Sequence, residues 1–232
     1  VTPEKRIAQA MRALADVARR QPAAHLLLVG ATADYYDAVA DARSLGVGDR
    51  VTVTGYVPDA DLSAYLSAAD VCLCLRWPTG RETSASWLRA VAAGRATIIT
   101  DLTHADDVTT IDPRDWSARP GAWPDRGQAS RGEPPDAGLA GTPHGCDGPG
   151  RGGPEPVAVA IDILDEEHSL ILAMRRLAVD ADLRERLGRA AREHWASDHT
   201  LAHMAQDYDR AIAAAMASPV PRPAGLPPHV FQ

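Results

Sequence analysis

The sequence is poor in aromatic residues and in cysteine, and it lacks a long apolar run. Aromatic residues make up 5% of the chain, with a single Phe, so we expect a core built from Leu, Val, Ile and Ala. The three cysteines, Cys72, Cys74 and Cys146, are too few for a disulfide framework. No apolar run reaches membrane-spanning length, and the first residues show no apolar signal segment. These absences predict a cytoplasmic protein without a transmembrane segment.

An excess of positive charge is also missing. The chain has 24 basic and 31 acidic residues, a formal net charge of −7, which argues against a nucleic-acid surface or a polybasic membrane patch. It contains no G-x-G-x-x-G after a predicted strand, and no G-x-x-x-x-G-K-[ST], G-x-S-x-G or H-E-x-x-H motif. Cys72 and Cys74 alternate within an apolar run, so we interpret them as core residues on one face of a strand rather than as metal ligands.

Strand and helix patterns alternate along most of the chain. Continuous apolar runs bounded by Gly are typical of strands covered on both faces, and stretches with apolar residues at helical spacing lie between them. This alternation predicts an α/β fold with a doubly wound parallel sheet, followed by C-terminal helices. The predicted strands are 25–30, 51–54, 71–75, 96–100 and 157–161, and the predicted helices are 7–18, 35–45, 62–69, 84–93, 166–179, 183–195 and 201–216.

The first predicted helix begins only a few residues into the sequence. An α/β domain rarely begins without a strand, so the sequence looks cut just after a missing first strand. Asp180 or Asp182, and Thr200, are expected to cap the last two helices. The stripe of Met204, Tyr208 and Ile212 on the final helix is either partly exposed here or packed on the sheet.

Composition divides the chain into four segments. Residues 1–112 are expected to form the first part of an α/β domain, and residues 157–217 its C-terminal strand and helices. Between them, residues 113–156 are so rich in Gly and Pro that we predict a disordered insertion, because the segment buries too little apolar surface to offset its ordering entropy. The Pro-rich tail, residues 218–232, is predicted to be disordered as well.

The loop 76–84 carries the most informative chemistry. It joins a predicted strand to a predicted helix, which is where parallel sheets bind ligands. Two arginines, several hydroxyls and small residues suit a pyrophosphate at the helix N-terminus, and the carboxylate of Glu82 suits sugar hydroxyls better than phosphate. The alternative is that Thr83 or Ser84 only caps the helix and that Glu82 is a favourable first-turn acid.

Six segments in order resemble a known family. They are 2–6 (TPEKR), 27–30 (LLVG), 53–57 (VTGYV), 68–71 (AADV), 76–88 and 92–95 (AAGR). Their joint order and spacing resemble the C-terminal domain of the GT-B glycosyltransferases of family 4, the glycosyl transferases group 1. The resemblance covers residues 1–112 closely and the helices after Val157 more loosely.

The resemblance implies a nucleotide-sugar-binding domain and a retaining transfer from a nucleotide-diphosphate sugar, usually without a metal ion; we therefore expect no metal and no cofactor, with the nucleotide sugar as substrate. Lys5 matches the lysine that neutralises the donor pyrophosphate, and Glu82 matches the first carboxylate of a paired-Glu motif that contacts the donor sugar. Gly80, Thr83 and Ser84 match the phosphate loop. The segment Gly55 to Val57 matches the one beside the nucleobase. Together the resemblance and the loop chemistry indicate a donor site of Gly30, Gly55, Tyr56, Val57, Thr79, Gly80, Thr83, Ser84 and Arg89.

The sequence also departs from the family pattern. Arg89 stands where the second Glu of the pair is expected, and it either adds charge near the diphosphate or forms a surface ion pair. The N-terminal, acceptor-binding half of a GT-B enzyme has no counterpart here, so the chain is expected to bind donor and to transfer poorly by itself. Alternative interpretations are a non-catalytic nucleotide-binding module, a truncated inactive fragment, or a sugar-nucleotide epimerase of the same fold.

Overall fold

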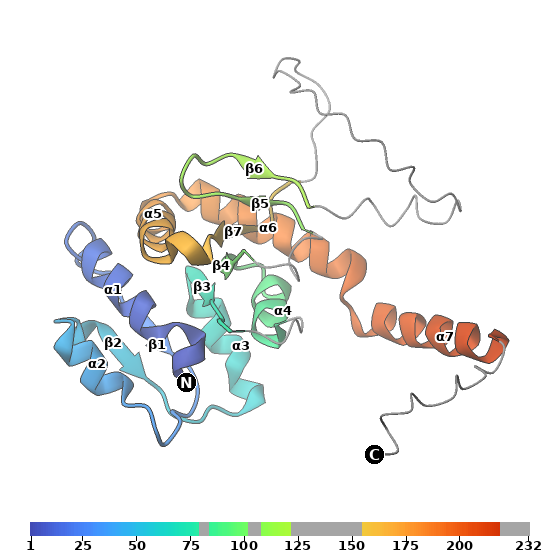
Figure 1. Ribbon diagram of the computed structural model, residues 1–232, viewed down its shortest axis with the longest axis horizontal. Helices are drawn as coiled ribbons and strands as arrows, with labels where there is room; N and C mark the ends of the chain where they lie inside the picture. Colours follow the sequence, from blue (N-terminus) through green and yellow to red (C-terminus); the bar gives the residue numbers. More distant parts are fainter. Residues whose placement is uncertain (79–83, 102–107, 122–154, 219–232) are drawn as a thin grey trace, which may run out of the picture.

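The computed structural model describes residues 1–78, 84–101, 108–121 and 155–218, and within them strands and helices alternate as predicted (Figure 1). The short 3-10 helix η1 (Pro3–Lys5) precedes the first α-helix. In the described residues the α-helices and β-strands are, in chain order, α1 (Ile7–Val17), β1 (Leu26–Leu28), α2 (Ala38–Ser44), β2 (Val51–Val53), α3 (Asp59–Ala68), β3 (Val71–Cys74), α4 (Ala85–Ala92), β4 (Ala96–Thr100), β5 (Thr110–Ile111), β6 (Ala118–Arg119), β7 (Ala158–Ile161), α5 (Glu166–Val179), α6 (Ala181–Asp198) and α7 (Leu201–Ala217).

The strands form two separate sheets rather than one. A parallel pair joins β1 to β2. A larger sheet has the order β3-β4-β7-β5-β6, parallel except for β6, which runs antiparallel to β5. The parallel α/β fold predicted from the sequence is therefore confirmed, with its strands divided between two sheets in the described residues. The interruption lies between β1 and β3.

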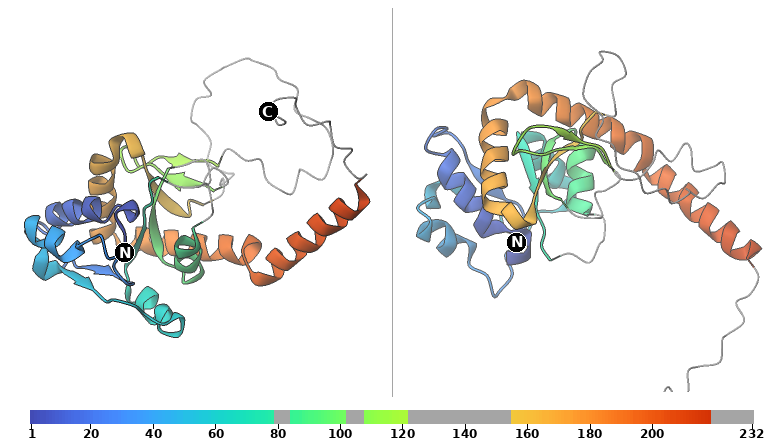
Figure 2. Two further views of the ribbon diagram at one scale, coloured as in Figure 1. Left: turned by 60° about the horizontal axis from the view of Figure 1, so that its bottom comes forward. Right: turned by 45° about the horizontal axis from the view of Figure 1, so that its top comes forward.

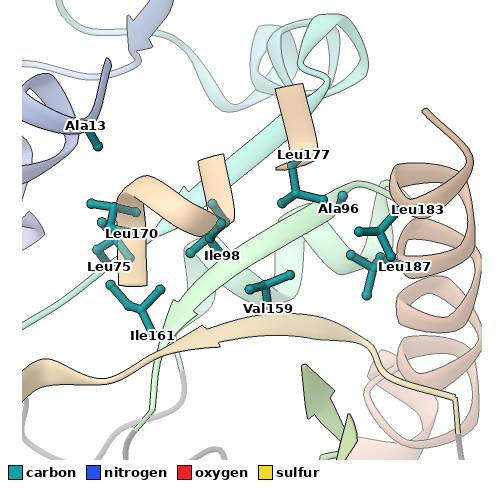
Figure 3. Close-up of a cluster of buried hydrophobic side chains, with 11 residues drawn as sticks. Ala13, Leu75, Ala96, Ile98, Val159, Ile161, Leu170, Leu177, Leu183 and Leu187 are labelled. Carbon is teal, nitrogen blue, oxygen red and sulfur yellow. The ribbon is translucent and has the colours of Figure 1, made fainter. Parts of the chain in front are cut away.

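One face of the five-stranded sheet packs against α5 and the start of α6. Ile98 of β4 and Val159 of β7 are fully buried there beneath Leu170 of α5. Figure 3 shows these side chains between the strands and the two helices, with Leu183 and Leu187 of α6 at one end of the cluster. Branched aliphatic side chains supply this layer, as expected from the scarcity of aromatic residues.

The opposite face packs against α4 and the second half of α6. Trp87 of α4 lies in this cluster, and its indole N–H donates to the Thr97 hydroxyl at 3.2 Å. That bond satisfies a buried donor and a buried acceptor together. The backbone of α6 at Gly188 packs directly against the turn after α4. A methyl group added at Gly188 would lie only 2.2 Å from the carbonyl oxygen of Gly94.

The pair β1–β2 has its own core, and α1 joins this core to the larger sheet. Met11 and Leu14 of α1 are buried against the β1–β2 side, whereas Ala13 on the same helix belongs to the core under α5. Two ion pairs cross from this part of the chain to α5, Arg6–Glu166 and Arg175–Asp16. The cover on β1 is one-sided, because Leu27 remains 39% exposed and α3 contains no buried residue.

The prediction that residues 113–156 are disordered is wrong for residues 113–121. This segment turns back at Trp116 and forms β6 beside β5. The almost fully buried carboxylate of Asp112 accepts hydrogen bonds from Arg114 and Arg119, and Arg114 reaches on to Asp162 after β7. These charge-assisted bonds order the turn together with the buried Pro113 and with Trp116, which packs against the core under α5. Composition does not reveal these contacts. Residues 122–154 lie outside the described residues.

The last helices are capped as the sequence predicts. The carboxylate of Asp180 accepts from the Leu183 N–H at 2.9 Å at the start of α6, and the Thr200 hydroxyl accepts from the His203 N–H at the start of α7. α7 projects away from both sheets (Figure 2). It buries no residue, and Tyr208 is 64% exposed, so the apolar stripe does not cover the sheet.

No helix in the part of the chain that the structure describes is both long enough and apolar enough to cross a membrane.

The close approach of α6 to the turn at Gly94 predicts how a substitution of Gly188 changes the free energy of unfolding. Gly188→Ala should lower the free energy of unfolding by about 1–3 kcal/mol, because the new methyl group forces two backbones apart. Helix propensity alone would raise it by about 1 kcal/mol, so the two effects have opposite signs. Urea unfolding compared with the exposed neighbour variant Arg189→Ala checks this. A more stable Gly188→Ala protein would contradict the packing.

A second prediction concerns pH. Hydrogen bonds from Arg114, aided by the charge of Arg119, hold the pKa of Asp112 below its ordinary value. A lowered pKa contributes stability above the unfolded value of about 3.9, and that stability is lost as pH falls through the folded value. Asp112→Asn should therefore cost about 1–3 kcal/mol at neutral pH and progressively less below about pH 4. Urea unfolding across this range, with Asp209→Asn on exposed α7 as control, measures the difference; a pH-independent difference would refute it.

Candidate functional site

The carboxyl ends of the parallel strands meet on one edge of the molecule, and the N-terminal residues lie there too. The Trp77 N–H, just after β3, donates to the Glu4 carbonyl of η1 at 2.9 Å. The pKa of Glu4 lies below its ordinary value because its own backbone N–H and the Thr2 side chain hydrogen-bond the carboxylate, and the charge of Arg76 lowers it further. η1 is thus fixed beside the start of the loop 76–84.

Lys5 occupies the last position of η1, exposed at this edge. The bond between the Trp77 N–H and the carbonyl of Glu4, the residue before Lys5, places Lys5 near the end of β3. Burial raises the pKa of the Cys74 thiol, and the positive charge of Lys5 partly opposes that rise. Burial likewise raises the pKa of Cys72 to about 11. Both cysteines are therefore neutral thiols at physiological pH. Lys5 is also the only lysine in the 232 residues, so its amine is chemically unique among the side chains.

Gly30 and Gly55 come together where β1 and β2 end. They form an isolated bridge, and both have positive φ, 131° and 70°. A methyl group added at either would meet no atom within 4 Å, so their backbones border open space. Positive φ favours glycine at these positions. Tyr56 follows with its side chain 80% exposed, and Val57 is half-buried.

Ser84 is the N-cap of α4. Its hydroxyl accepts from the Trp87 N–H at 3.3 Å, as the capping alternative predicted. One of the free N–H groups at the helix start is thereby satisfied by the protein itself. The backbone N–H groups of Ala85 and Ser86 also lie in the first turn of α4, where N–H groups have no acceptor within the helix.

Arg89 lies on the exposed side of α4 and forms a surface ion pair with Asp59, at the start of α3, with an N–O distance of 3.2 Å. Of the two alternatives for Arg89, the structure shows the ion pair. The pair links α4 to the segment that follows Val57, so Arg89 lies at the same edge as Gly55.

Four of the predicted site residues lie outside the described residues. They are Thr79, Gly80, Glu82 and Thr83. The described part of the predicted site therefore consists of Lys5, the Gly30–Gly55 bridge with Tyr56 and Val57, and Ser84 and Arg89 on α4.

Sequence analysis did not single out Arg6 or Glu166. Arg6 has a left-handed backbone conformation, φ 57°, and its guanidinium donates to both carboxylate oxygens of Glu166, with Nε 2.6 Å from Oε1. These hydrogen bonds raise the pKa of Arg6. The two residues are 160 positions apart, so the adjacency of Arg6 to Lys5 was the only signal in the sequence. The pair anchors the residue next to Lys5 on α5.

A shallow hollow lies at the other edge of the molecule, where α5 ends and α6 begins, lined by Arg176, Val179 and residues 180–182. α5 starts at the carboxyl end of β7, so its last turn lies toward the amino ends of the strands. That position is remote from Lys5. Ligands of parallel sheets bind at the carboxyl ends of the strands, so this hollow is not where a ligand of the sheet is expected. Within the described ranges, no three His, Cys, Asp or Glu side chains are grouped to hold a metal ion.

The parallel sheet with its carboxyl-edge loops has the Rossmann-like fold of GT-B glycosyltransferases. The chain belongs to the glycosyl transferases group 1 family, whose model matches residues 1–119, more than half of the chain. No curated protein sequence is significantly similar to it.

Two solved structures share the fold. The first is WaaG, a glycosyltransferase involved in lipopolysaccharide biosynthesis, with a TM-score of 0.54 and 18% identity over 85% of this chain and 40% of that one. The second is the sucrose-phosphate synthase of Thermosynechococcus elongatus, with a TM-score of 0.51 and 20% identity over 89% of this chain and 43% of that one. The chain thus spans well under half the length of either protein.

Two substitutions of Arg6 distinguish the contribution of its side-chain hydrogen bonds to stability from the cost of its left-handed backbone conformation. Arg6→Ala should lower the free energy of unfolding by about 1–3 kcal/mol, through the lost bonds to Glu166. Arg6→Gly loses the same bonds but tolerates the left-handed conformation, so it should be less destabilised by up to about 1 kcal/mol. Glu166→Gln, which keeps the shape, serves as the control in urea unfolding. Equal or greater loss in Arg6→Gly than in Arg6→Ala would argue against the left-handed backbone.

Proposed function

We propose that this chain is the donor-binding half of a retaining glycosyltransferase, which transfers a glycosyl group from a nucleotide-diphosphate sugar to an acceptor bound elsewhere. The observation that carries the proposal is the placement of Lys5. In a member of the glycosyl transferases group 1 family, the only lysine stands exposed at the carboxyl edge, beside the start of the loop 76–84.

The proposed role of Lys5 is electrostatic. When the bond between sugar and diphosphate breaks, negative charge accumulates on the leaving phosphate oxygens. A fixed ammonium group near those oxygens stabilises that charge more in the transition state than in the bound donor. First-turn N–H groups of α4 add positive potential from the other side of the loop. This arrangement stabilises the leaving group without a metal ion.

The remaining site residues would bind the other parts of the donor. The open backbones of Gly30 and Gly55 allow a ligand to approach closely, and the exposed Tyr56 offers a flat apolar face to a nucleobase. The carboxylate of Glu82, in the loop between β3 and α4, would accept hydrogen bonds from the sugar hydroxyls. Arg89 pairs with Asp59, so we assign it to holding α3 on α4 rather than to the diphosphate.

The proposed acceptor-binding half would lie against α7. The helix presents Met204, Tyr208 and Ile212 to solvent along one stripe, and an exposed stripe of this kind marks an interaction surface. The chain covers 40% of WaaG and 43% of the sucrose-phosphate synthase, which leaves room for a second half of similar size. Transfer by this chain alone should therefore be weak.

Labelling of the single lysine tests donor binding directly. Saturating UDP- or GDP-sugar should slow acetylation of Lys5 by an amine-reactive reagent, because a bound diphosphate covers the ammonium group. Mass spectrometry resolves this modification from that of the Val1 amine, which serves as the internal reference. Calorimetry with Lys5→Ala should show a loss of about 1.5–3 kcal/mol, or roughly tenfold to a hundredfold in affinity. Arg186→Ala, an exposed cation on α6, is the matched control.

Glu82→Gln separates a glycosyltransferase donor site from a plain nucleotide site. We expect this variant to bind the nucleotide-sugar more weakly than the parent chain and to bind the free nucleoside diphosphate equally well. Equal affinity for both ligands would favour a non-catalytic nucleotide-binding module. Acetylation of Lys5 at one rate with every nucleotide, from folded protein, would overturn the proposed donor site.

A further inference from the structure

Two histidines face each other where α6 meets α7. The Nε2 atom of His194, near the end of α6, lies 3.0 Å from the Nε2 atom of His199, the residue that follows α6. Their ring centroids are 4.8 Å apart, and the rings meet edge to face at 64°. Both residues are half-buried, so solvent reaches them. The fold thus brings two imidazole nitrogens together at the surface.

Packing and the helix ends hold the two rings in place. The His194 ring contacts that of Trp87 with 6.3 Å between centroids, within the usual range of aromatic contacts. Trp87 is itself buried, and its indole N–H is held by the Thr97 hydroxyl. The His199 N–H donates to the Trp195 carbonyl at 2.9 Å, and the capped start of α7 follows directly. The position of the pair is therefore set by rigid elements, as a binding site requires.

The charged side chains near the pair leave it accessible to a cation. Glu193 and Asp198, each next to one of the histidines in the sequence, are exposed. Arg192 is held elsewhere, because its guanidinium lies 4.6 Å from the Trp195 ring centroid and donates to the Ala92 carbonyl at the end of α4. One basic and two acidic side chains give residues 192–199 a formal charge of −1 with the histidines neutral. The whole chain carries −7, which also favours a cation.

The distance between the two nitrogens suits a shared metal ion as well as a hydrogen bond. Bonds from an imidazole nitrogen to a metal ion of this kind are about 2.0–2.1 Å long. Two such bonds at an angle of about 90° place their nitrogens about 2.9 Å apart, and the tetrahedral angle of Zn²⁺ places them about 3.3 Å apart. The observed 3.0 Å is closer to the first value. Ligands at about 90° are those of square-planar and tetragonal sites, which are typical of Cu²⁺ and Ni²⁺.

We propose that His194 and His199 form a two-histidine chelate for a divalent transition-metal ion, with Cu²⁺ preferred. Imidazole suits Cu²⁺, which has the highest affinity for a given nitrogen site among the divalent first-row ions. The ion binds both Nε2 atoms, and water occupies its other positions, since the described ranges contain no group of three protein ligands. The proton that one Nε2 carries in the hydrogen-bonded pair moves to Nδ1 of the same ring, so both histidines bind as neutral imidazoles.

A bound ion would strengthen the junction between α6 and α7. His194 belongs to α6, which packs on the sheet, whereas α7 buries no residue and depends on the junction for its attachment. Two coordination bonds would replace one hydrogen bond between His194 and the residue that precedes the cap of α7. The inference rests on the histidine pair alone. It assigns the ion no part in glycosyl transfer and is independent of the donor site.

Titration of the full chain with Cu²⁺ alone tests the site. Electron paramagnetic resonance of the first equivalent should show two imidazole ligands. His194→Gln and His199→Gln should each leave one imidazole and weaken binding in calorimetry by tenfold or more, because loss of a group that only supports a ligand already costs about 10–100-fold. His25→Gln and His203→Gln are the matched controls, since a ring nitrogen of each contacts a threonine hydroxyl instead. Both controls should bind Cu²⁺ as tightly as the parent chain.

Hydrogen exchange followed by mass spectrometry gives a second measurement. With one equivalent of Cu²⁺, the amides of His199 and Met204 at the junction should exchange about threefold or more slowly, and those of β6 should not change. His199→Gln should abolish this protection of the Met204 amide.

Several results would overturn the chelate. A parent spectrum with fewer than two imidazoles would do so whatever the variants show. Equal affinity in all four variants would assign the binding to scattered histidines, and a loss confined to His203→Gln would assign it to α7. Tighter binding of Zn²⁺ than of Cu²⁺ would contradict the geometry. No nucleotide is present in these measurements, so their failure leaves the donor-binding proposal unaffected, and the reverse also holds.

Discussion

The contact between α1 and α5 holds the two sheets of this protein together. Because β1 and β2 do not pair with the five-stranded sheet in the described residues, strand hydrogen bonds cannot transmit the position of one sheet to the other. α1 does so through buried apolar residues and through two ion pairs, Arg6–Glu166 and Arg175–Asp16. The Asp16 carboxylate is nearly buried, and its hydrogen bond from Arg175 lowers its pKa. Removal of one partner of such a pair leaves a poorly solvated charge.

The position of the candidate site depends on the same contact. α1 begins at the carboxyl edge of the strands, and the bond from Trp77 to Glu4 fixes η1 against the end of β3. Lys5 is therefore held between two anchors, the Arg6 pair on one side and the Glu4 carbonyl on the other. Both anchors fix the backbone at Lys5, from which its exposed side chain extends.

Two apolar surfaces of the described residues are open to solvent. The first is the stripe on α7, which buries no residue. The second is the outer face of β1 at Leu27, beside the interval between the sheets. Both are places where a larger assembly would bury apolar area, and each is worth about 25 cal/mol per Å² removed from water.

The sequence by itself determined the order and type of the elements, because apolar spacing reports which side of a helix or strand is buried. Ile7, Met11 and Leu14 recur at helical spacing, and all three are buried on α1. Thr200, and either Asp180 or Asp182, were identifiable as caps, since a cap bonds only to residues close in the chain; the structure shows Thr200 and Asp180. Composition misled in one place. The glycine and proline content predicted disorder for residues 113–121, but this segment is ordered, with two arginines bound to the buried carboxylate of Asp112. Only the tertiary structure decided the split of the sheet, the Arg6–Glu166 anchor and the position of Lys5, because these contacts join residues far apart in sequence whose separation in space no local pattern encodes.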